Sequence, residues 1–377
     1  MEKVGIMSMQ RIANYGSFLQ AYALRCLLED LSCQVQFVDY RVEPPLVRDP
    51  GDSGSPALRK VKKGLETLGY PAPLSQKLEF IRYKRSFGPR YLPLLGIGEE
   101  KNYDPELDCL VIGSDEVFNC VQKNTNVGYS LDLFGRGSRA RRRITYAASF
   151  GNTTLEKLEK FGKTAEIGKL LGSLDGLSVR DRNSGRIVEA LTGKTPLYHL
   201  DPVLTYDYLG RCDRIPTLEP REDYLILYAY SGRISPAESR WIRDYARKRG
   251  LKVYTIGGVQ SCGDRFLDCG PFEVLAHFKN AREVITDTFH GTIFSVITHR
   301  PFVSLIRRSV GDGYGNEEKL TDLLDRLGLS DRAAGEIGQA AEILTRPIDG
   351  AGIDALLARH RREAMAYLRE NLAEEGR

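Results

Sequence analysis

Several short motifs that mark common enzyme classes are missing from this 377-residue chain. The glycine-rich fingerprints GxGxxG and GxxxxGK[ST] are absent, which argues against a dinucleotide-binding or P-loop enzyme. The GxSxG elbow of hydrolases is absent as well. No apolar run approaches the ~20 residues that cross a bilayer, and no signal-peptide pattern precedes the apolar strand that begins at Val4. We therefore expect a cytoplasmic protein.

Cysteine is sparse, and its spacing fits no metal site. The chain has no CxxC pair, and Cys262 and Cys269 have no histidine at zinc-like spacing nearby. Free, mostly buried thiols in a reducing compartment are the expected state of the seven cysteines. We expect no metal and no other cofactor.

Length and composition indicate an ordinary two-domain protein. The chain is 42% hydrophobic and 28% charged, and its length exceeds one ordinary core. We divide it near Asp207, into an N-terminal domain of residues 1–206 and a C-terminal domain of residues 207–350. Residues 351–377 form a final helix whose apolar residues follow one stripe, and we expect it to pack back on the first domain.

Short apolar strands repeatedly end in small and polar residues. In the first half these strands are Val4–Ser8, Val35–Tyr40, Asp108–Ile112, Ile144–Phe150 and Leu177–Arg182. In the second half they are Tyr224–Tyr230, Lys252–Gly257, Glu283–Thr286 and Pro301–Leu305. Helical segments separate many of them, so the pattern predicts α/β sheets whose carboxyl-end loops line a crevice.

A long insertion, Arg41–Pro105, interrupts the first domain. Its early part is rich in proline and glycine and predicts an irregular loop, whereas Leu74–Phe87 has a helical pattern. Basic residues gather at Arg59–Lys63 and at Arg136–Arg143. Two interpretations stay open for these runs. One is a solvated basic face, and the other is attraction to anionic lipid at the inner face of a membrane or to a pyrophosphate-linked acceptor. Aromatic residues do not interleave with them, so we expect no nucleic acid.

The stretch Val284–Ile293, VITDTFHGTI, is the strongest candidate for chemistry. A strand that ends in Asp and Thr and then opens a helix makes an anion site, because free backbone N–H groups and the helix dipole face the ligand. His290 then lies beside that anion, and histidine is well suited to proton transfer at neutral pH. The alternative is a histidine satisfied within the core.

Six ordered motifs make the chain resemble the polysaccharide pyruvyl transferase family. Glu116 is one departure, where a Gln or similar residue is expected. The motifs are NYGSFLQAYAL at Asn14–Leu24, VIGSDEVFN at Val111–Asn119, TYAASFG at Thr145–Gly151, SVRD at Ser178–Asp181, DPVL at Asp201–Leu204 and TDTFHGTIFS at Thr286–Ser295.

The resemblance implies an activity and a fold. Enzymes of this family transfer a pyruvyl group from phosphoenolpyruvate to a sugar diol as a ketal and release phosphate. The sugar belongs to a glycan or a lipid-linked oligosaccharide. The implied fold is a GT-B-like pair of doubly wound, Rossmann-like domains facing a cleft, and the spacing of the strands favours the same arrangement.

This chemistry needs cations for the donor and a proton donor or acceptor, which the chain can supply. His290 is the candidate acid or base, and Asp115 is the candidate base for the attacking hydroxyl. The donor-binding candidates are Arg180, Thr288, Gly291, Thr292 and Arg307. The acceptor-binding candidates are Asn14, Tyr15, Gly16, Gln20, Ser114 and Asn119.

Each assignment has a structural alternative. Arg180 could form a salt bridge with Asp181 or a neighbouring acid, and Thr288 and Thr292 could cap their helix. Asp115 could be the N-cap of a helix that follows it. Two other functions also stay open: a GT-B glycosyltransferase that uses a nucleotide sugar, and a non-catalytic glycan-binding protein.

Overall fold

The structure, a computed structural model, describes residues 1–47, 64, 66–122, 128–308 and 315–372. The chain forms two compact units. Unit 1 comprises Met1–Asp49, Pro89–Asp207 and Ala355–Arg377, and unit 2 comprises Pro50–Gly88 and Tyr208–Asp354. Relative to the predicted division, unit 2 therefore also takes part of the insertion, and unit 1 takes the C-terminal helix from Ala355 onward. The basic run at 59–63 lies outside the described residues.

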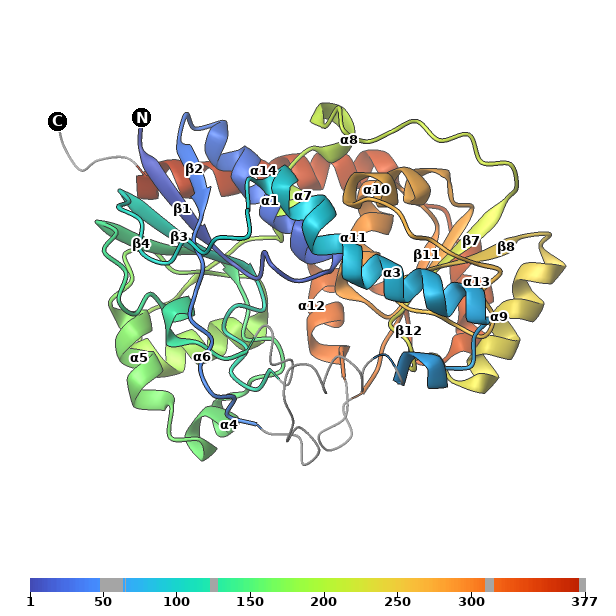
Figure 1. The fold of residues 1–377 in the computed structure, drawn as a ribbon, viewed down its shortest axis with the longest axis horizontal. Helices are drawn as coiled ribbons and strands as arrows, with labels where there is room; N and C mark the ends of the chain where they lie inside the picture. The colour runs from blue at the N-terminus through green and yellow to red at the C-terminus, as the bar shows by residue number, and fades with distance from the viewer. Residues whose placement is uncertain (48–63, 65, 123–127, 309–314, 373–377) are drawn as a thin grey trace. The chain divides into compact units, whose positions relative to one another are not determined.

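The centre of unit 1 is a parallel sheet in the order β2-β1-β3-β4-β5-β6 (Figure 1). All seven residues of β3 are buried, as expected of a parallel strand covered on both faces. The chain order reverses between β1 and β3, and this switch point is where such sheets place their ligands. The strands are β1 (Lys3–Met7), β2 (Gln34–Phe37), β3 (Cys109–Asp115), β4 (Arg142–Ala148), β5 (Ser178–Val179) and β6 (Leu197–Tyr198).

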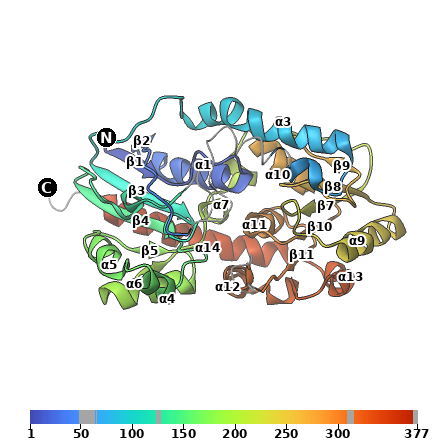
Figure 2. The ribbon, with the colours of Figure 1, turned by 60° about the horizontal axis from the view of Figure 1, so that its bottom comes forward.

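Helices cover both faces of this sheet (Figure 2). α1 lies on one face, and α5 and α6 lie on the other, where Phe118, Phe134 and Phe150 stack within the main core of the unit. The helices of unit 1 are α1 (Tyr15–Glu29), η1 (Leu92–Leu95), η2 (Leu131–Phe134), α4 (Leu155–Lys160), α5 (Thr164–Gly172), α6 (Arg182–Thr192), α7 (Pro202–Thr205) and most of α14 (Gly350–Leu372).

Unit 2 is built on a second parallel sheet, in the order β12-β11-β10-β7-β8-β9. This is the order of a nucleotide-binding doubly wound sheet, with its switch point between β7 and β10. The strands are β7 (Tyr224–Tyr228), β8 (Lys252–Ile256), β9 (Arg265–Phe266), β10 (Glu283–Thr286), β11 (Phe302–Leu305) and β12 (Ala333–Ala334).

The start of helix α9 in unit 2 is fixed by a capping motif that can be read in the sequence. Ser235 and Glu238 form a reciprocal capping box at the start of α9, which satisfies two backbone N–H groups that the helix would otherwise leave open. The helices are α3 (Leu74–Tyr91), α8 (Tyr208–Arg211), α9 (Pro236–Lys248), α10 (Pro271–Asn280), α11 (Phe289–Ile297), α12 (Glu317–Leu327), η3 (Ser330–Arg332), η4 (Ile337–Gln339) and α13 (Ala340–Thr345).

The predicted fold class, two doubly wound α/β domains, is confirmed by the two parallel sheets. The predicted helix at 74–87 is confirmed as α3, which extends to Tyr91. Within the described ranges, no helix has both the length and the apolarity that a membrane crossing requires. Seven free cysteines are described, and all except Cys26 are buried.

Candidate functional site

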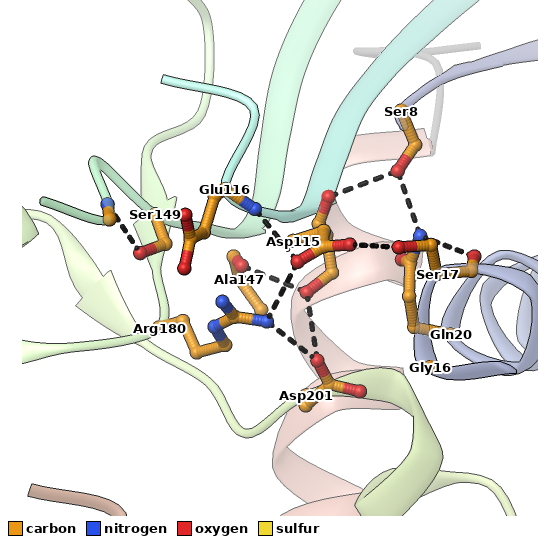
Figure 3. Close-up of polar contacts among 12 residues, drawn as sticks. Ser8, Gly16, Ser17, Gln20, Asp115, Glu116, Ala147, Ser149, Arg180 and Asp201 are labelled. Carbon is orange, nitrogen blue, oxygen red and sulfur yellow. Dashed lines mark hydrogen bonds and ion pairs between the residues drawn. The ribbon is translucent and has the colours of Figure 1, made fainter. Parts of the chain in front are cut away.

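Arg180 lies in a buried polar network at the strand ends of unit 1 (Figure 3). Its guanidinium Nη1 is 2.9 Å from Oδ2 of Asp201 and 3.7 Å from Oδ1 of Asp115. Burial acts to lower the pKa of Arg180, but the attraction of Asp201 and Asp115 outweighs it and raises that pKa. The structural alternative for Arg180, a salt bridge to a neighbouring acid, is therefore observed, and Asp201 is the main partner. Binding of the donor by Arg180 stays a prediction.

Both carboxylate oxygens of Asp115 are engaged by protein groups. Ser17 Oγ donates to Oδ2 at 2.7 Å, while the backbone N–H of Glu116 donates to Oδ1 at 3.0 Å. The described residues that follow Asp115, up to residue 122, form a turn and bend rather than a helix. The role of Asp115 as a base for a sugar hydroxyl stays a prediction. It would require the sugar hydroxyl to replace one of these two hydrogen-bond donors.

The predicted acceptor residues converge on the same region of unit 1, and most of them are buried. Asn14 caps α1 by accepting from the backbone N–H groups of Gly16 and Ser17. Gln20 Nε2 donates to Ser8 Oγ at 2.9 Å. The remaining members are also held internally: Ser114 Oγ donates to the Ala147 carbonyl, Asn119 Nδ2 donates to Glu116, and Tyr15 is buried.

In unit 2 the predicted threonines and glycine support the start of α11. Thr288 is the N-cap, and its Oγ1 accepts from the backbone N–H of Gly291 at 3.0 Å. Thr292 Oγ1 is 2.7 Å from Ser304 Oγ. A Cβ on Gly291 would lie 2.2 Å from Thr286 Oγ1, so glycine is required by the threonines themselves. These contacts favour structural roles, and donor binding by these three residues stays a prediction.

His290 occupies the first turn of α11 and is partly exposed. Its ring packs edge-on against Phe289, with centroids 5.5 Å apart, and also approaches Phe294. His290 comes shortly after Asp287 and Thr288 in the chain, in the helix that follows β10. Its role as acid or base stays a prediction.

A cavity of about 890 Å³ lies at the strand ends of unit 2. Its walls come from the segments that follow β7, β10, β11 and β12, so it lies at the switch point of the sheet. The lining includes Arg307, which the sequence predicted, and two further cations. The lining residues are Gly232, Arg233, Asp287, Ile306, Arg307, Arg308, Glu317, Gly335 and Glu336.

Arg307 keeps hydrogen-bonding capacity in this cavity. Its Nη1 donates to Glu238 Oε1 at 2.6 Å, and its Nε is 4.0 Å from Oδ2 of Asp287. Nε and Nη2 of Arg307 are buried and make no hydrogen bond within the part of the chain that the structure describes. A buried guanidinium with unused N–H groups is costly, and an oxyanion in the cavity would satisfy them.

Asp287 is the innermost acid of the cavity, with a side chain that is fully buried. Burial raises the pKa of Asp287 to about 6, although Arg233 and Arg307 act to lower it. Arg233 Nη1 lies 3.8 Å from Oδ1 of Asp287, and the Arg233 guanidinium stacks 4.4 Å above the Tyr230 ring. Arg233 and Asp287 were not assigned roles from the sequence. The available signal was their position in the segments that follow β7 and β10.

A smaller cavity of about 240 Å³ lies beside β2 in unit 1, and it too was not predicted. Arg11 and Asp39 line it and already pair with each other, with Arg11 Nη2 donating to Asp39 Oδ2 at 2.8 Å. The hydrogen bond from Arg11 opposes the effect of burial and leaves the pKa of Asp39 lowered. Two charged side chains of this smaller cavity, Arg11 and Asp39, therefore pair with each other.

Several arginines of the basic run Arg136–Arg143 form ion pairs or hydrogen bonds with other segments of unit 1. Arg136 pairs with Glu43 at 2.7 Å, and Arg143 Nη2 donates to the Ser173 carbonyl at 3.1 Å. Arg142 Nη1 donates to the carbonyl of Asn371 on α14. These contacts favour a structural role for the run. Contact with a membrane surface stays a prediction.

Comparisons of the fold show that it is shared with solved structures of low sequence identity. The structure of S. aureus MnaA with UDP has a TM-score of 0.50 and 12% identity, covering 100% of this chain and 99% of that one. A glycotransferase of kitacinnamycin has a TM-score of 0.47 and 11% identity, and the UDP-GlcNAc 2-epimerase of Neisseria meningitidis has 0.47 and 8%; both alignments cover 99% of each chain. The GT-B-like class of the fold is confirmed.

Sequence comparison assigns the family. Comparison with curated proteins gives no match. The sequence model of one family, polysaccharide pyruvyl transferase, matches residues 14–309. This span contains all six motifs and the switch point of unit 2, and it covers well over half of the 377 residues. The chain therefore belongs to the polysaccharide pyruvyl transferase family.

Proposed function

We propose that the protein transfers the pyruvyl group of phosphoenolpyruvate to two hydroxyls of a sugar, forming a ketal and releasing phosphate. The family supports a transferase that acts in polysaccharide biosynthesis. The observation that carries the donor assignment is the arginine-lined cavity at the switch point of unit 2. Phosphoenolpyruvate has a phosphate and a carboxylate, and guanidinium groups bind both kinds of oxyanion with paired hydrogen bonds.

The three arginines of this cavity would contribute differently to donor binding. Arg307 offers Nε and Nη2, which lack hydrogen bonds among the described residues, and Arg233 offers a second cation from the opposite side of the switch point. Arg308 is 83% exposed and pairs with Glu317 at 3.4 Å. It therefore contributes mainly long-range attraction, which solvent screens.

The reaction then needs proton transfer at defined atoms. A proton is added to C3 of the donor while a sugar hydroxyl forms a bond to C2 and gives up its proton. The bond from C2 to the phosphate oxygen breaks, the second hydroxyl closes the ketal at C2, and the proton of that hydroxyl leaves with the phosphate. His290 is our candidate for one of these proton transfers, because its imidazole follows the strand end that forms the cavity.

Calorimetric titration with phosphoenolpyruvate tests the donor assignment. Loss of a charge-assisted hydrogen bond costs about 1.5–3 kcal/mol, so Arg307→Gln should weaken binding at least about tenfold. Arg240→Gln, an exposed arginine on α9, is the matched control and should bind as wild type does. Arg233→Gln provides a second variant, because Arg307→Gln also removes the partner of Glu238.

Two results would count against the proposal. One is the absence of phosphoenolpyruvate binding to the wild-type protein. The other is equal affinity in wild type, Arg307→Gln and Arg233→Gln, which would place the donor elsewhere. If a nucleotide sugar bound in place of phosphoenolpyruvate, the glycosyltransferase alternative would replace the pyruvyl-transfer assignment.

A further inference from the structure

Among the residues that the structure describes, the lining of the unit 2 cavity carries as many arginines as acids. Arg233, Arg307 and Arg308 face Asp287, Glu317 and Glu336 in the lining. Arg308 and Glu317 pair at the rim, where both are substantially exposed. Deeper in the cavity, an incoming anion must share Arg233 and Arg307 with the buried carboxylate of Asp287.

Charged groups from four segments act on Asp287. Arg233 follows β7, Arg307 follows β11, Glu238 lies on α9 and Lys319 lies on α12. Burial acts to raise the pKa of Glu238, but the hydrogen bond and charge of Arg307, together with the hydrogen bonds from Ser235, outweigh it and lower that pKa below its usual value. Glu238 therefore stays ionised near neutral pH, so Asp287 is the buried acid here that can change its charge.

The backbone around Asp287 is held by Asn316 and not only by contacts of the Asp287 carboxylate. Asn316 Nδ2 donates to the backbone carbonyl of Asp287 at 2.7 Å and to that of Leu305 at 3.0 Å. Its Oδ1 accepts from the backbone N–H of Arg307 at 2.6 Å. One asparagine thus ties together the segments that follow β10 and β11, whatever the charge of the carboxyl group.

We infer that Asp287 takes up a proton when an anion occupies the unit 2 cavity, so that donor binding is coupled to neutralisation of this carboxylate. The inference rests on the proposed function, because it takes this cavity as the donor site. The step is balanced: the carboxylate gains one proton from solvent, and the anion gains the two arginines that the carboxylate held.

The direction of the coupling follows from electrostatics. A second negative charge close to a carboxylate disfavours its ionised form and raises its pKa further. In the free protein that pKa is about 6, so Asp287 is mostly ionised above neutral pH. Anion affinity should therefore fall as pH rises above about 6, by up to about tenfold per pH unit, until the pKa of the occupied state is passed.

Sulfate is the appropriate probe, because it stays a dianion throughout this pH range and contributes no proton of its own. Calorimetry near pH 7.5 in two buffers of different ionisation enthalpy measures the protons exchanged. We expect wild type to take up close to one proton per sulfate. Asp287→Asn should take up none and bind sulfate with little pH dependence. From the pKa of about 6, its affinity should exceed that of wild type about thirtyfold near pH 7.5 and about twofold near pH 6.

Two further variants identify the titrating group. His290→Gln should retain the uptake, because the anion competes for Arg233 and Arg307 with Asp287 and not with the imidazole. Glu317→Gln should retain it as well, since Glu317 is 49% exposed at the rim. Uptake that disappeared in either variant, or persisted in Asp287→Asn, would overturn the assignment to Asp287.

The failure of this inference is separable from that of the proposed function. Sulfate and phosphoenolpyruvate binding that Arg307→Gln weakens, without proton uptake by wild type, would overturn the coupling and leave the donor site in place. The wild-type measurement in two buffers requires no variant, so an absence of proton uptake overturns the coupling even if Asp287→Asn does not fold. Uptake that wild type, His290→Gln and Glu317→Gln share supports Asp287 in that case. Loss of phosphoenolpyruvate binding alone, with proton-linked sulfate binding intact, would instead remove the proposed donor.

Discussion

Replacement of Arg180 by methionine should destabilise unit 1 rather than remove a ligand contact. The Arg180 side chain is 4% exposed, and the side chain of its main partner, Asp201, is fully buried. Methionine fills similar space without charge and takes the guanidinium away from the buried carboxylate of Asp201, which keeps the backbone N–H of Val203 as a donor. Breaking such a pair costs about 3–5 kcal/mol, which is a large share of the ~5–15 kcal/mol that stabilises a typical domain. The double variant Arg180→Met/Asp201→Asn should recover part of this loss.

Hydrogen exchange of peptides from β3 and β4 measures this loss where it should occur. The chain's one tryptophan, Trp241, lies on α9 of unit 2, so its fluorescence reports on the other unit. Arg182→Met is the matched control, because Arg182 is exposed at the start of α6 and should change stability by less than about 0.5 kcal/mol. Unchanged protection in Arg180→Met, together with weaker phosphoenolpyruvate binding, would refute this reasoning and restore Arg180 as a donor ligand.

Two other predictions concern the helix that carries the histidine. His290→Gln should lower turnover at least about a hundredfold, since it removes a proton donor or acceptor, while calorimetry shows donor affinity unchanged. Normal turnover in the folded variant would remove His290 from the mechanism. Thr288→Val keeps the shape of the side chain but removes the N-cap of α11. It should lower the unfolding free energy by about 1 kcal/mol in denaturant titration. A drop in donor affinity without that loss would instead support the ligand role.

The long elements of the fold were predictable because burial on both faces leaves a clear apolar run. The bounds of β10 agree with those expected from the sequence. The two-residue strands β6, β9 and β12 were missed, since two residues are too few to show a period. β6 is also exposed, with Leu197 and Tyr198 facing solvent, so it gives no burial signal.

The candidate site was predictable only in its location. Polar residues after parallel strands meet at one edge of a sheet, and this rule brought Ser114, Asp115 and Arg180 together in unit 1. Whether such a side chain faces a ligand or another residue depends on distances across the fold. Arg180 meets Asp201 from 21 positions away, and Arg307 meets Glu238 from 69 positions away. The local sequence holds no sign of either pairing.

The two switch points differ in how far the protein satisfies its own charges, and this difference decides where binding energy is available. Arg180 is closely paired with a buried acid, so a ligand would have to break that ion pair before it gained the arginine. Arg307 gives one nitrogen to Glu238, while Nε and Nη2 stay without a hydrogen bond among the described residues. Because buried N–H groups without acceptors raise the free energy of the folded state, an oxyanion placed there relieves a cost that the fold already bears. By the same reasoning, Asp287 is the residue whose protonation changes on binding, because an anion that enters the cavity replaces its carboxylate as the partner of Arg233 and Arg307.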